Sequence, residues 1–493
     1  MPDQAAPRVR QNADRMLSES YRLRDDATVA SEDDGSVMLW QARGRARIAA
    51  PSAGTRAVLL RLAGQWADEA DISRVIIAAE GEGGIMRGRM LLRRLELHSW
   101  LSRRISAGNR TLLEVIPVAL GAGTAPRRTR PVPDVTYQLS RFATISANGG
   151  LVAQAPFSPV AVRVFDPKIA ALLVPVASAG ATVAELARLG GFDLAAATAV
   201  AETLVTARIL VPAAERRAQD HEPPQAVWSA HELALHSRAR AGWHALPNGG
   251  TYRFRGEFPS EPIDREPDGS ASDLPVPDLG KISAIEPSLT EVITARRSIR
   301  EYDDANPITS DQLAEFLYRV QHTSQLRDTS DGQGTGQRPY PAGGQLCELE
   351  IYPLVSRCFG IEAGLYRYDS VAHRLIRLAP LHDAAERMLK HADETALMGT
   401  PPQVLLAITI RAQRILWKYE GMGYEMALKN AGVLTGLMYL VAAAMDLAPC
   451  ALGSGDSAAF ALLSGIDPLV EPYIADFALG SKAVSSIPRR EPA

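Results

Sequence analysis

Apolar residues recur every three or four positions between residues 423 and 446, which is the period of an α-helix. The stretch reads GYEMALKNAGVLTGLMYLVAAAMD, and so many of its positions are apolar that we expect a helix buried on most sides. Other stretches alternate: QLCELEIYPLV predicts a strand, GLYRYDSVAHRLIRL a strand pair and PPQVLLAITIRA a buried strand. ITSDQLAEFLYRVQ predicts a helix capped by Thr309 and Gln312. The last two hundred residues therefore predict an α+β domain.

Two stretches of the N-terminal half resemble each other. YRLRDDATVASEDDGSVML begins at Tyr21 and VTYQLSRFATISANGGLVAQ carries Tyr137, an offset of 137 − 21 = 116 residues. In each copy, strand-like residues precede helical patterns, a helix-turn-helix-like pair and a final strand. This order predicts two winged-helix-like α/β modules, residues 1–123 and 135–215, joined by TAPRRTRPVPD. Chance similarity over so few residues is the alternative.

Residues 216–285 are rich in proline, glycine and acidic residues, a composition typical of a boundary or linker. Within them VWSAHELALHSRARAGW predicts an embedded helix. The final domain then spans residues 286–493.

Charge and cysteine content narrow the class of protein. The formal net charge of −3 over 493 residues argues against a nucleic-acid-binding protein. The N-terminus lacks a signal peptide, and the run VLTGLMYLVAAAM is too short for a bilayer, so no membrane association is expected. Cys347, Cys358 and Cys450 have no CxxC spacing and predict reduced thiols in a cytoplasmic protein. No metal-ligand spacing is present, and we expect no metal.

Two motifs open the C-terminal domain. In ARRSIREYDD, Arg296, Ser298 and Arg300 alternate, so in an extended segment they would form a clamp for an anion and a polyol. A solvated basic turn explains the same spacing equally well. In RPYPAGGQL, paired glycines would let the backbone approach a flat ligand, whereas a tight turn is the alternative.

Glycines also mark two later segments. ALGSGDSAAFALLSGIDP contains G-x-G-x-x-A, but too few strands follow it for a dinucleotide-binding fold. A turn that brings backbone N–H groups near a ligand, followed by a helix capped by Asp456, fits better. Gly432 and Gly436 lie four residues apart in the long helix, which suits either a dimer interface or a crossing within the domain.

RRSIREY, PYPAGG, GLYRYD, WKYEGMGY and LGSGD occur in this order between residues 286 and 482. Together they resemble the nitroreductase-like flavoproteins, and more narrowly the SagB-type peptide dehydrogenases, the azoline oxidases of thiazole/oxazole-modified peptide pathways. The resemblance implies an α+β domain with a mixed sheet flanked by helices. Cyanobactin oxidases of this type carry paired winged-helix-like modules similar to the leader-recognition element, so the N-terminal modules are candidates for binding a leader peptide.

The resemblance also implies FMN at a homodimer interface. Arg296, Ser298 and Arg300 would hold the ribityl-phosphate, with Lys482 as a further phosphate partner. The isoalloxazine would lie along two segments, namely Pro341, Ala342, Gly343, Gly344 and Gln345, and Gly453 with Ser454. Ala342 stands where the family usually has serine, which puts one hydroxyl contact in doubt.

Lys418 and Tyr419 match the catalytic Lys-Tyr pair of azoline oxidases. Aromatising an azoline of a ribosomally made precursor peptide removes a hydride and a proton, and an apolar pocket would make lysine a usable base. A lysine snorkelling beside a packed tyrosine is the alternative. Two other functions stay open: an NAD(P)H-dependent reductase of dehydroamino acids, nitro compounds or quinones, and a non-catalytic scaffold in a complex with a cyclodehydratase.

Overall fold

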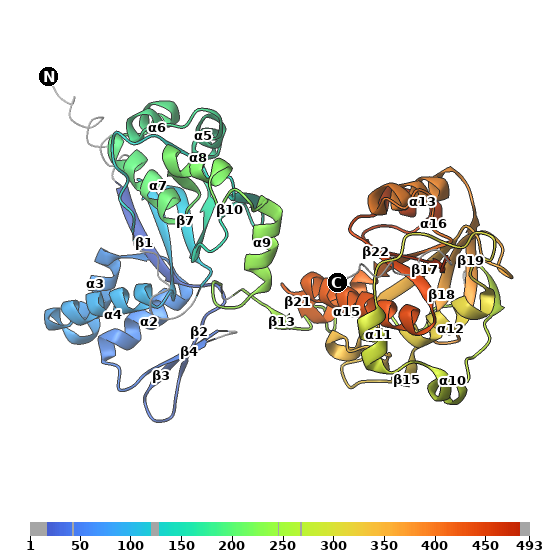
Figure 1. The fold of residues 1–493 in the computed structure, drawn as a ribbon. Helices are drawn as coiled ribbons and strands as arrows, with labels where there is room; N and C mark the ends of the chain where they lie inside the picture. Colours follow the sequence, from blue (N-terminus) through green and yellow to red (C-terminus); the bar gives the residue numbers. More distant parts are fainter. Residues whose placement is uncertain (1–16, 42–43, 120–127, 245, 267–268, 484–493) are drawn as a thin grey trace, which may run out of the picture. The chain divides into compact units, whose positions relative to one another are not determined.

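The computed structural model describes residues 17–41, 44–119, 128–244, 246–266 and 269–483. The chain divides into two compact units, residues 1–248 and 249–493 (Figure 1). This boundary falls inside the predicted linker 216–285, which is folded on both sides of it. The first unit contains α8 (Ala213–His221) and the expected embedded helix, α9 (Ala230–Ala239). The second contains β13 (Gly249–Gly250), β14 (Ser270–Asp273) and α10 (Leu279–Ile285).

A seven-stranded antiparallel sheet forms the centre of the first unit, in the order β5-β1-β6-β7-β11-β10-β9. Its strands are β1 (Leu17–Leu23), β5 (Ala67–Asp68), β6 (Leu101–Ala107), β7 (Arg110–Pro117), β9 (Thr144–Ala147), β10 (Leu151–Gln154) and β11 (Val160–Val164). The pair β7–β11 joins a strand of each predicted module, with Val115 opposite Val162. The two modules therefore share one sheet.

The same sequence of elements occurs twice in this unit. The first copy continues with β2 (Thr28–Ser31), β3 (Val37–Gln41), β4 (Gly44–Ile48), α2 (Ala53–Gly64), α3 (Glu69–Glu80) and α4 (Ile85–Leu97). The second has β8 (Tyr137–Leu139), α5 (Pro167–Ser178), α6 (Val183–Gly190), α7 (Leu194–Thr206) and β12 (Leu210–Pro212). Tyr21 pairs with Ala67 as Tyr137 pairs with Ala181. The repeat suggested by the sequence thus has a counterpart in strand pairing.

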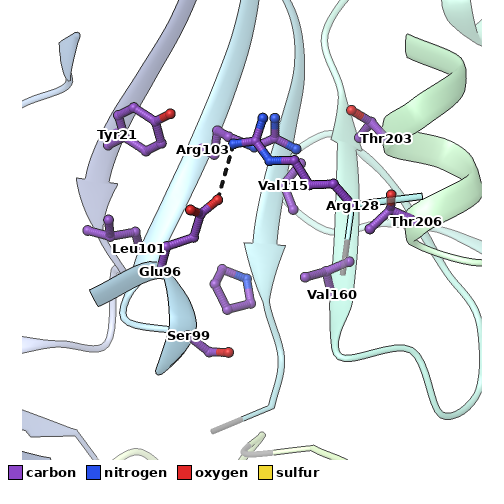
Figure 2. A pocket seen from close by; sticks show the side chains of 11 residues that line it. Tyr21, Glu96, Ser99, Leu101, Arg103, Val115, Arg128, Val160, Thr203 and Thr206 are labelled. Carbon is purple, nitrogen blue, oxygen red and sulfur yellow. Dashed lines mark hydrogen bonds and ion pairs between the residues drawn. The ribbon is translucent and has the colours of Figure 1, made fainter. Parts of the chain in front are cut away.

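Arg128, in the segment between the modules, is held by two carboxylates of the first module. Its guanidinium lies 3.1 Å from Glu19 Oε1 and 3.1 Å from Glu96 Oε1 (Figure 2). Burial opposes ionisation of Glu19, but the charges of Arg103 and Arg128 outweigh it and lower the pKa of Glu19. Val160 and Thr203 of the second module line the same pocket. Arg128 is therefore fixed by ion pairs to the first module, in a pocket that both modules line.

The second unit is a three-layer domain. Its central sheet has the order β14-β19-β18-β17-β20-β23-β22, and its strand pairs are antiparallel throughout, where the resemblance implied a mixed sheet. The strands are β17 (Leu349–Val355), β18 (Gly364–Asp369), β19 (Arg374–Pro380), β20 (Val404–Ile410), β22 (Leu447–Leu452) and β23 (Tyr473–Ser481). β17 and β20 are buried on both faces, as expected for the centre of the domain.

Helices cover both faces of this sheet. Alternate residues of β20 pack into two different cores: Val404 and Leu406 contribute to the core with α12 (Ser310–Gln321) and α15 (Gly423–Ala444). Leu405 and Ala407 contribute to the core with α13 (Asp383–Ala396) and α16 (Ser457–Ser464). The remaining elements of the second unit are α11 (Leu289–Ala295), α14 (Ala412–Lys418), β15 (Ser324–Arg327), β16 (Thr335–Gln337), β21 (Tyr419–Glu420) and a 3₁₀ turn (Gly343–Gln345). A second 3₁₀ turn (Glu82–Gly84) lies in the first unit.

One side of helix α15 is exposed, although the sequence predicted a helix buried on most sides. With 22 residues it is long and apolar enough to span a bilayer, although the apolar run alone was expected to be too short. Ala427, Leu434 and Met438 are fully buried, as in the core helix of a domain, yet only 39% of the apolar window is buried. The expectation of burial on most sides is therefore wrong. Tyr424, Leu428 and Val433 are exposed on the helix, as are Gly432 and Gly436.

Candidate functional site

Lys418 and Tyr419 lie where α14 ends. The backbone of Tyr419 is extended (φ −103°, ψ 128°) and pairs with Gly250 of β13, so the helix cannot continue through it. Both side chains are half-buried. Lys418 Nζ lies 5.5 Å from the centre of the Tyr419 ring and 5.3 Å from that of Tyr252. The amine of the lysine thus lies beside two aromatic rings.

The glycine loop that follows Pro341 lies directly against this pair. Gly344 has φ 75°, a conformation that strains other residues. A Cβ atom at Gly344 would lie 2.7 Å from Tyr419 Oη and 3.4 Å from Lys418 Nζ. A side chain has no room there, because the two functional groups occupy the space beside the glycine. The structure therefore brings the predicted catalytic pair and the predicted flavin loop together.

An asparagine of α15 fixes the loop from behind, and the sequence did not point to it. Gly343 N donates to Asn430 Oδ1 (3.3 Å), and Asn430 Nδ2 donates to Glu348 Oε1 (2.5 Å). Glu348 is 1% exposed, and its second oxygen has no hydrogen-bond partner in the described part of the chain. A lone asparagine among the apolar residues of α15 was the available signal, because a buried amide needs polar partners.

Arg296, Ser298 and Arg300 form a second group, beside β22. Ser298 Oγ and Tyr439 Oη are 2.7 Å apart, and the tyrosine oxygen also accepts from Ala451 N (2.8 Å). The Arg296 guanidinium lies 5.3 Å from the centre of the Tyr439 ring. Among the described residues, no carboxylate is within ion-pair distance of Arg296 or Arg300. Two exposed cations beside a fixed hydroxyl suit a phosphate, because guanidinium groups bind phosphate with two hydrogen bonds.

Gly453 and Ser454 follow β22, whereas Lys482 follows β23 at the opposite end of that strand pair. Leu452 lies opposite Asp476 and Leu447 opposite Ser481. Lys482 Nζ bonds Asp446 Oδ1 at 2.6 Å. Its charge is therefore partly neutralised within the chain, and it is a weaker phosphate partner than the arginines.

The predicted cofactor residues thus form two separate groups within one chain. Gly343 packs near Met426, close to the start of α15, and Ser298 contacts Tyr439 near its end. Thirteen residues of α-helix between Met426 and Tyr439 span about 20 Å. A single chain does not bring the Arg296 group to the Gly344 loop.

Comparison with protein families decides what kind of domain holds these groups. The model of the nitroreductase family matches residues 293–480. These residues form a nitroreductase domain. A second model, described as the cyanobactin oxidase ThcOx, matches residues 137–245, which include the second N-terminal module. The two matches, in this order on one chain, support a SagB-type azoline oxidase, as the resemblance indicated.

Individual proteins are similar to parts of this chain. MJ1384 of Methanocaldococcus jannaschii, named provisionally as a nitroreductase, is 25% identical over 186 residues, covering 38% of this chain and 86% of MJ1384. A nitroreductase structure from Anabaena variabilis is 21% identical, with a TM-score of 0.34. That match covers 50% of this chain and 45% of the other, so this chain spans less than half of the Anabaena protein.

Two further solved structures match part of this chain. The Escherichia coli microcin synthetase McbBCD complex with truncated pro-MccB17 bound matches at 19% identity, with a TM-score of 0.33, over 50% of this chain and 85% of the other. A nitroreductase of Exiguobacterium sibiricum 255-15, solved in complex with FMN, matches at 11% identity, with a TM-score of 0.29. This match covers 42% of this chain and 94% of the other.

The residues of the nitroreductase domain fit the predicted FMN. Gly343 and Gly344 leave the loop without side chains, as a flat ring requires, and the cations of Arg296 and Arg300 remain available for a phosphate. Ala342 offers no hydroxyl in the loop. No group of three or more histidine, cysteine, aspartate or glutamate side chains that could hold a metal occurs among the described residues.

One buried carboxyl group near Gly453 and Ser454 was not predicted. Asp476 is 4% exposed and accepts a hydrogen bond from the Tyr473 hydroxyl. Burial raises the pKa of Asp476 to about 7, although the hydrogen bond from Tyr473 acts in the opposite direction. Both side chains lie against Gly455, which has no room for a Cβ atom. The nitroreductase domain therefore contains a proton-binding group beneath this loop.

Proposed function

We propose that this protein is an FMN-dependent dehydrogenase that oxidises thiazoline or oxazoline rings of a ribosomally made precursor peptide to thiazoles or oxazoles. The observation that carries the proposal is that Lys418 Nζ and Tyr419 Oη occupy the space that a side chain at Gly344 would need. It joins a proton-transfer pair to a loop suited to a flat cofactor, in a nitroreductase domain. The ThcOx match to the preceding module supports a peptide substrate.

The chemistry divides between the cofactor and the chain. FMN, when bound, supplies the acceptor for a hydride. Lys418 takes the proton from the neighbouring ring atom, and the electrons of that broken bond form the new double bond of the azole. The Tyr419 hydroxyl, against the same glycine, orients the ring or passes the proton on. Arg296, Ser298 and Arg300 hold the ribityl-phosphate, and the backbone of residues 341–345 supports the isoalloxazine.

A homodimer is part of the proposal. The Arg296 group and the Gly344 loop contact different parts of α15, near Tyr439 and Met426. Among the described residues, nothing lies within 4 Å of the position that a Cβ atom of Gly432 or Gly436 would take, which leaves this face open to a second helix. A two-fold pairing of α15 with its copy would bring one subunit's loop to the other subunit's arginines. We place the enzyme in the cytoplasm, together with a cyclodehydratase that forms its azoline substrate.

Anaerobic reduction of the flavin tests the reaction. An azoline peptide mixed with the yellow wild-type protein should bleach the flavin and yield the azole. Lys418→Ala should keep the fold and the colour, because the flavin is held elsewhere, but should bleach about 10²–10⁴-fold more slowly. Tyr419→Phe should be milder if the hydroxyl only orients the ring. Equal bleaching by wild type and Lys418→Ala would show that the base is another group.

A reductase is the second candidate, favoured by the similarity to MJ1384. It predicts rapid oxidation of NADPH by the yellow protein without any peptide. The dehydrogenase predicts reduction by the azoline peptide instead, so the two electron donors separate the two functions.

A further inference from the structure

Residues 249–266, part of the segment expected to be a linker, run along residues 411–420 as a strap. Gly249 and Gly250 pair with Glu420 and Tyr419, and Tyr252 N donates to Lys418 O (3.2 Å). Further along, Trp417 Nε1 donates to Phe258 O (2.9 Å). Arg411, fully buried, donates to Ile263 O (2.7 Å) and Glu261 Oε1 (3.0 Å). The strap is therefore fixed along the whole of α14, up to the catalytic pair.

This strap places Tyr252 over Lys418. The Tyr252 ring is fixed by an edge-on contact with Trp417, with ring centres 5.9 Å apart, and its centre lies 5.3 Å from Lys418 Nζ. Tyr252 has φ 52°, which is unusual for a residue with a side chain. A strained residue beside a functional group indicates a position set by surrounding contacts rather than by local preference.

The turn that carries Asp331 is tied to the strap. Asp331 accepts from Gln333 N (3.1 Å) and from Thr329 Oγ1, so its turn is ordered. The pKa of Asp331 is lowered, mainly by the Thr329 hydrogen bond, with further contributions from a hydrogen bond to the Tyr252 hydroxyl and the charge of Lys418. Arg255 of the strap donates to Ser330 O (3.2 Å), which ties the strap to this turn.

We propose that Tyr252 is a positioning residue for Lys418: its ring holds the amine beside Gly344. The proposal rests on the function proposed above. The other titratable groups beside the lysine are Tyr419 and Glu420, and Glu420 is engaged by Thr251 (3.2 Å) and Arg253 (3.7 Å).

The Tyr252 ring acts on the position of the lysine. Without it, the amine is free to leave Gly344, and misplacement of a reacting group by about 1 Å can cost roughly 10²-fold in rate.

Competitive acetylation of the lysines, read by peptide mass spectrometry, tests the contact without substrate. Holoenzyme is treated with trace acetic anhydride, and Lys418 is compared with Lys281, which is 84% exposed and serves as internal reference. Tyr252→Ala should raise the relative labelling of Lys418 severalfold, because the amine becomes more exposed without the ring. Tyr252→Phe, which keeps the ring, should stay nearer the wild type than Tyr252→Ala. Asp328→Asn, an exposed aspartate close by, should change nothing.

Unchanged relative labelling in Tyr252→Ala, in protein that remains yellow, would overturn the proposal. Failure of the wild type to bleach with an azoline peptide would instead overturn the proposed reaction, and increased labelling would still support the positioning of Lys418. The two failures are therefore distinguishable.

Discussion

At the scale of single residues, Arg296 and Arg300 offer the charge that a phosphate needs. Their joint replacement by alanine should yield colourless protein, because two cationic partners of the phosphate are lost. The measurement is the flavin released on denaturation per mole of protein. Arg297→Ala is the matched control, since this exposed arginine bonds only the backbone oxygen of Ala295 (3.2 Å) among the described residues. A fully yellow double variant would place the phosphate elsewhere.

Asp476 predicts a pH dependence of stability. Its pKa is about 7 in the folded chain, against an ordinary value of 3.8. Between these values the folded chain holds a proton that the unfolded chain releases, so stability falls as pH rises from about 4 to about 7. An asparagine side chain does not ionise, so Asp476→Asn should lose this dependence. At pH 8 its free energy of unfolding should exceed that of the wild type by at most roughly 4 kcal/mol.

The test of Asp476 compares Tm at pH 5 and pH 8. The Tm of Asp476→Asn should rise relative to the Tm of the wild type between pH 5 and pH 8. Asp311→Asn, at an exposed position, should show no such difference. An identical shift of Tm with pH in wild type and Asp476→Asn would show that Asp476 ionises at its ordinary pKa.

Sequence patterns identified those site residues that lie within a recognisable local motif. Lys418 and Tyr419 adjoin an apolar helix, and Arg296, Ser298 and Arg300 alternate within one short motif. Tyr252 and Asn430 could not be recognised this way. Each acts on a group far away in the sequence: Tyr252 on Lys418, and Asn430 on Gly343. Only folding brings these partners together.

At the scale of elements, the helices and strands of the second unit were largely predictable, because local signals agree with the fold. Thr309 and Gln312 form the expected capping box of α12, and Asp456 caps α16 as expected. The strap 249–266 was not predictable. It has no regular period, and it is ordered by Arg411 and Arg414, about 150 residues away, through hydrogen bonds to its backbone oxygens. The exposed face of α15 was also missed, because an exposed apolar face has the same sequence pattern as a buried one.

That face of α15 predicts the effect of a larger side chain. Gly436→Leu should weaken the dimer and lower flavin occupancy, because the leucine would separate the two helices at their proposed contact. Leucine is a better helix former than glycine by roughly 0.5–1 kcal/mol, so the subunit itself should not be destabilised. Analytical ultracentrifugation and flavin content measure both effects. Gly64→Leu, at the open C-terminal end of α2, is the control. A stable, fully yellow dimer of the Gly436 variant would exclude this face as the interface.

At the scale of the whole molecule, the division at residue 248 changes how the N-terminal modules are best removed. A cut at residue 216 would divide α8, which packs in the first unit, whereas residues 249–493 keep the strap, α14 and the catalytic pair together. The first unit also ends its sheet with an outer strand, β9, whose four residues are all exposed. Such a strand has unpaired backbone groups on its outer side and can accept an extended peptide by β-augmentation.

The last prediction concerns this unit and the leader of the precursor peptide. The full chain should bind a fluorescent leader peptide, and azoline peptide that carries its leader should have a lower KM than the same peptide without it. Residues 249–493 should bleach with leaderless peptide at the rate of the full chain, because the nitroreductase domain keeps every residue of the proposed site. They should gain nothing from the leader, because the sheet edge of the first unit is gone. Fluorescence polarisation and anaerobic bleaching measure the two parts separately. Equal leader affinity in both chains would assign the first unit another role, such as support of the dimer.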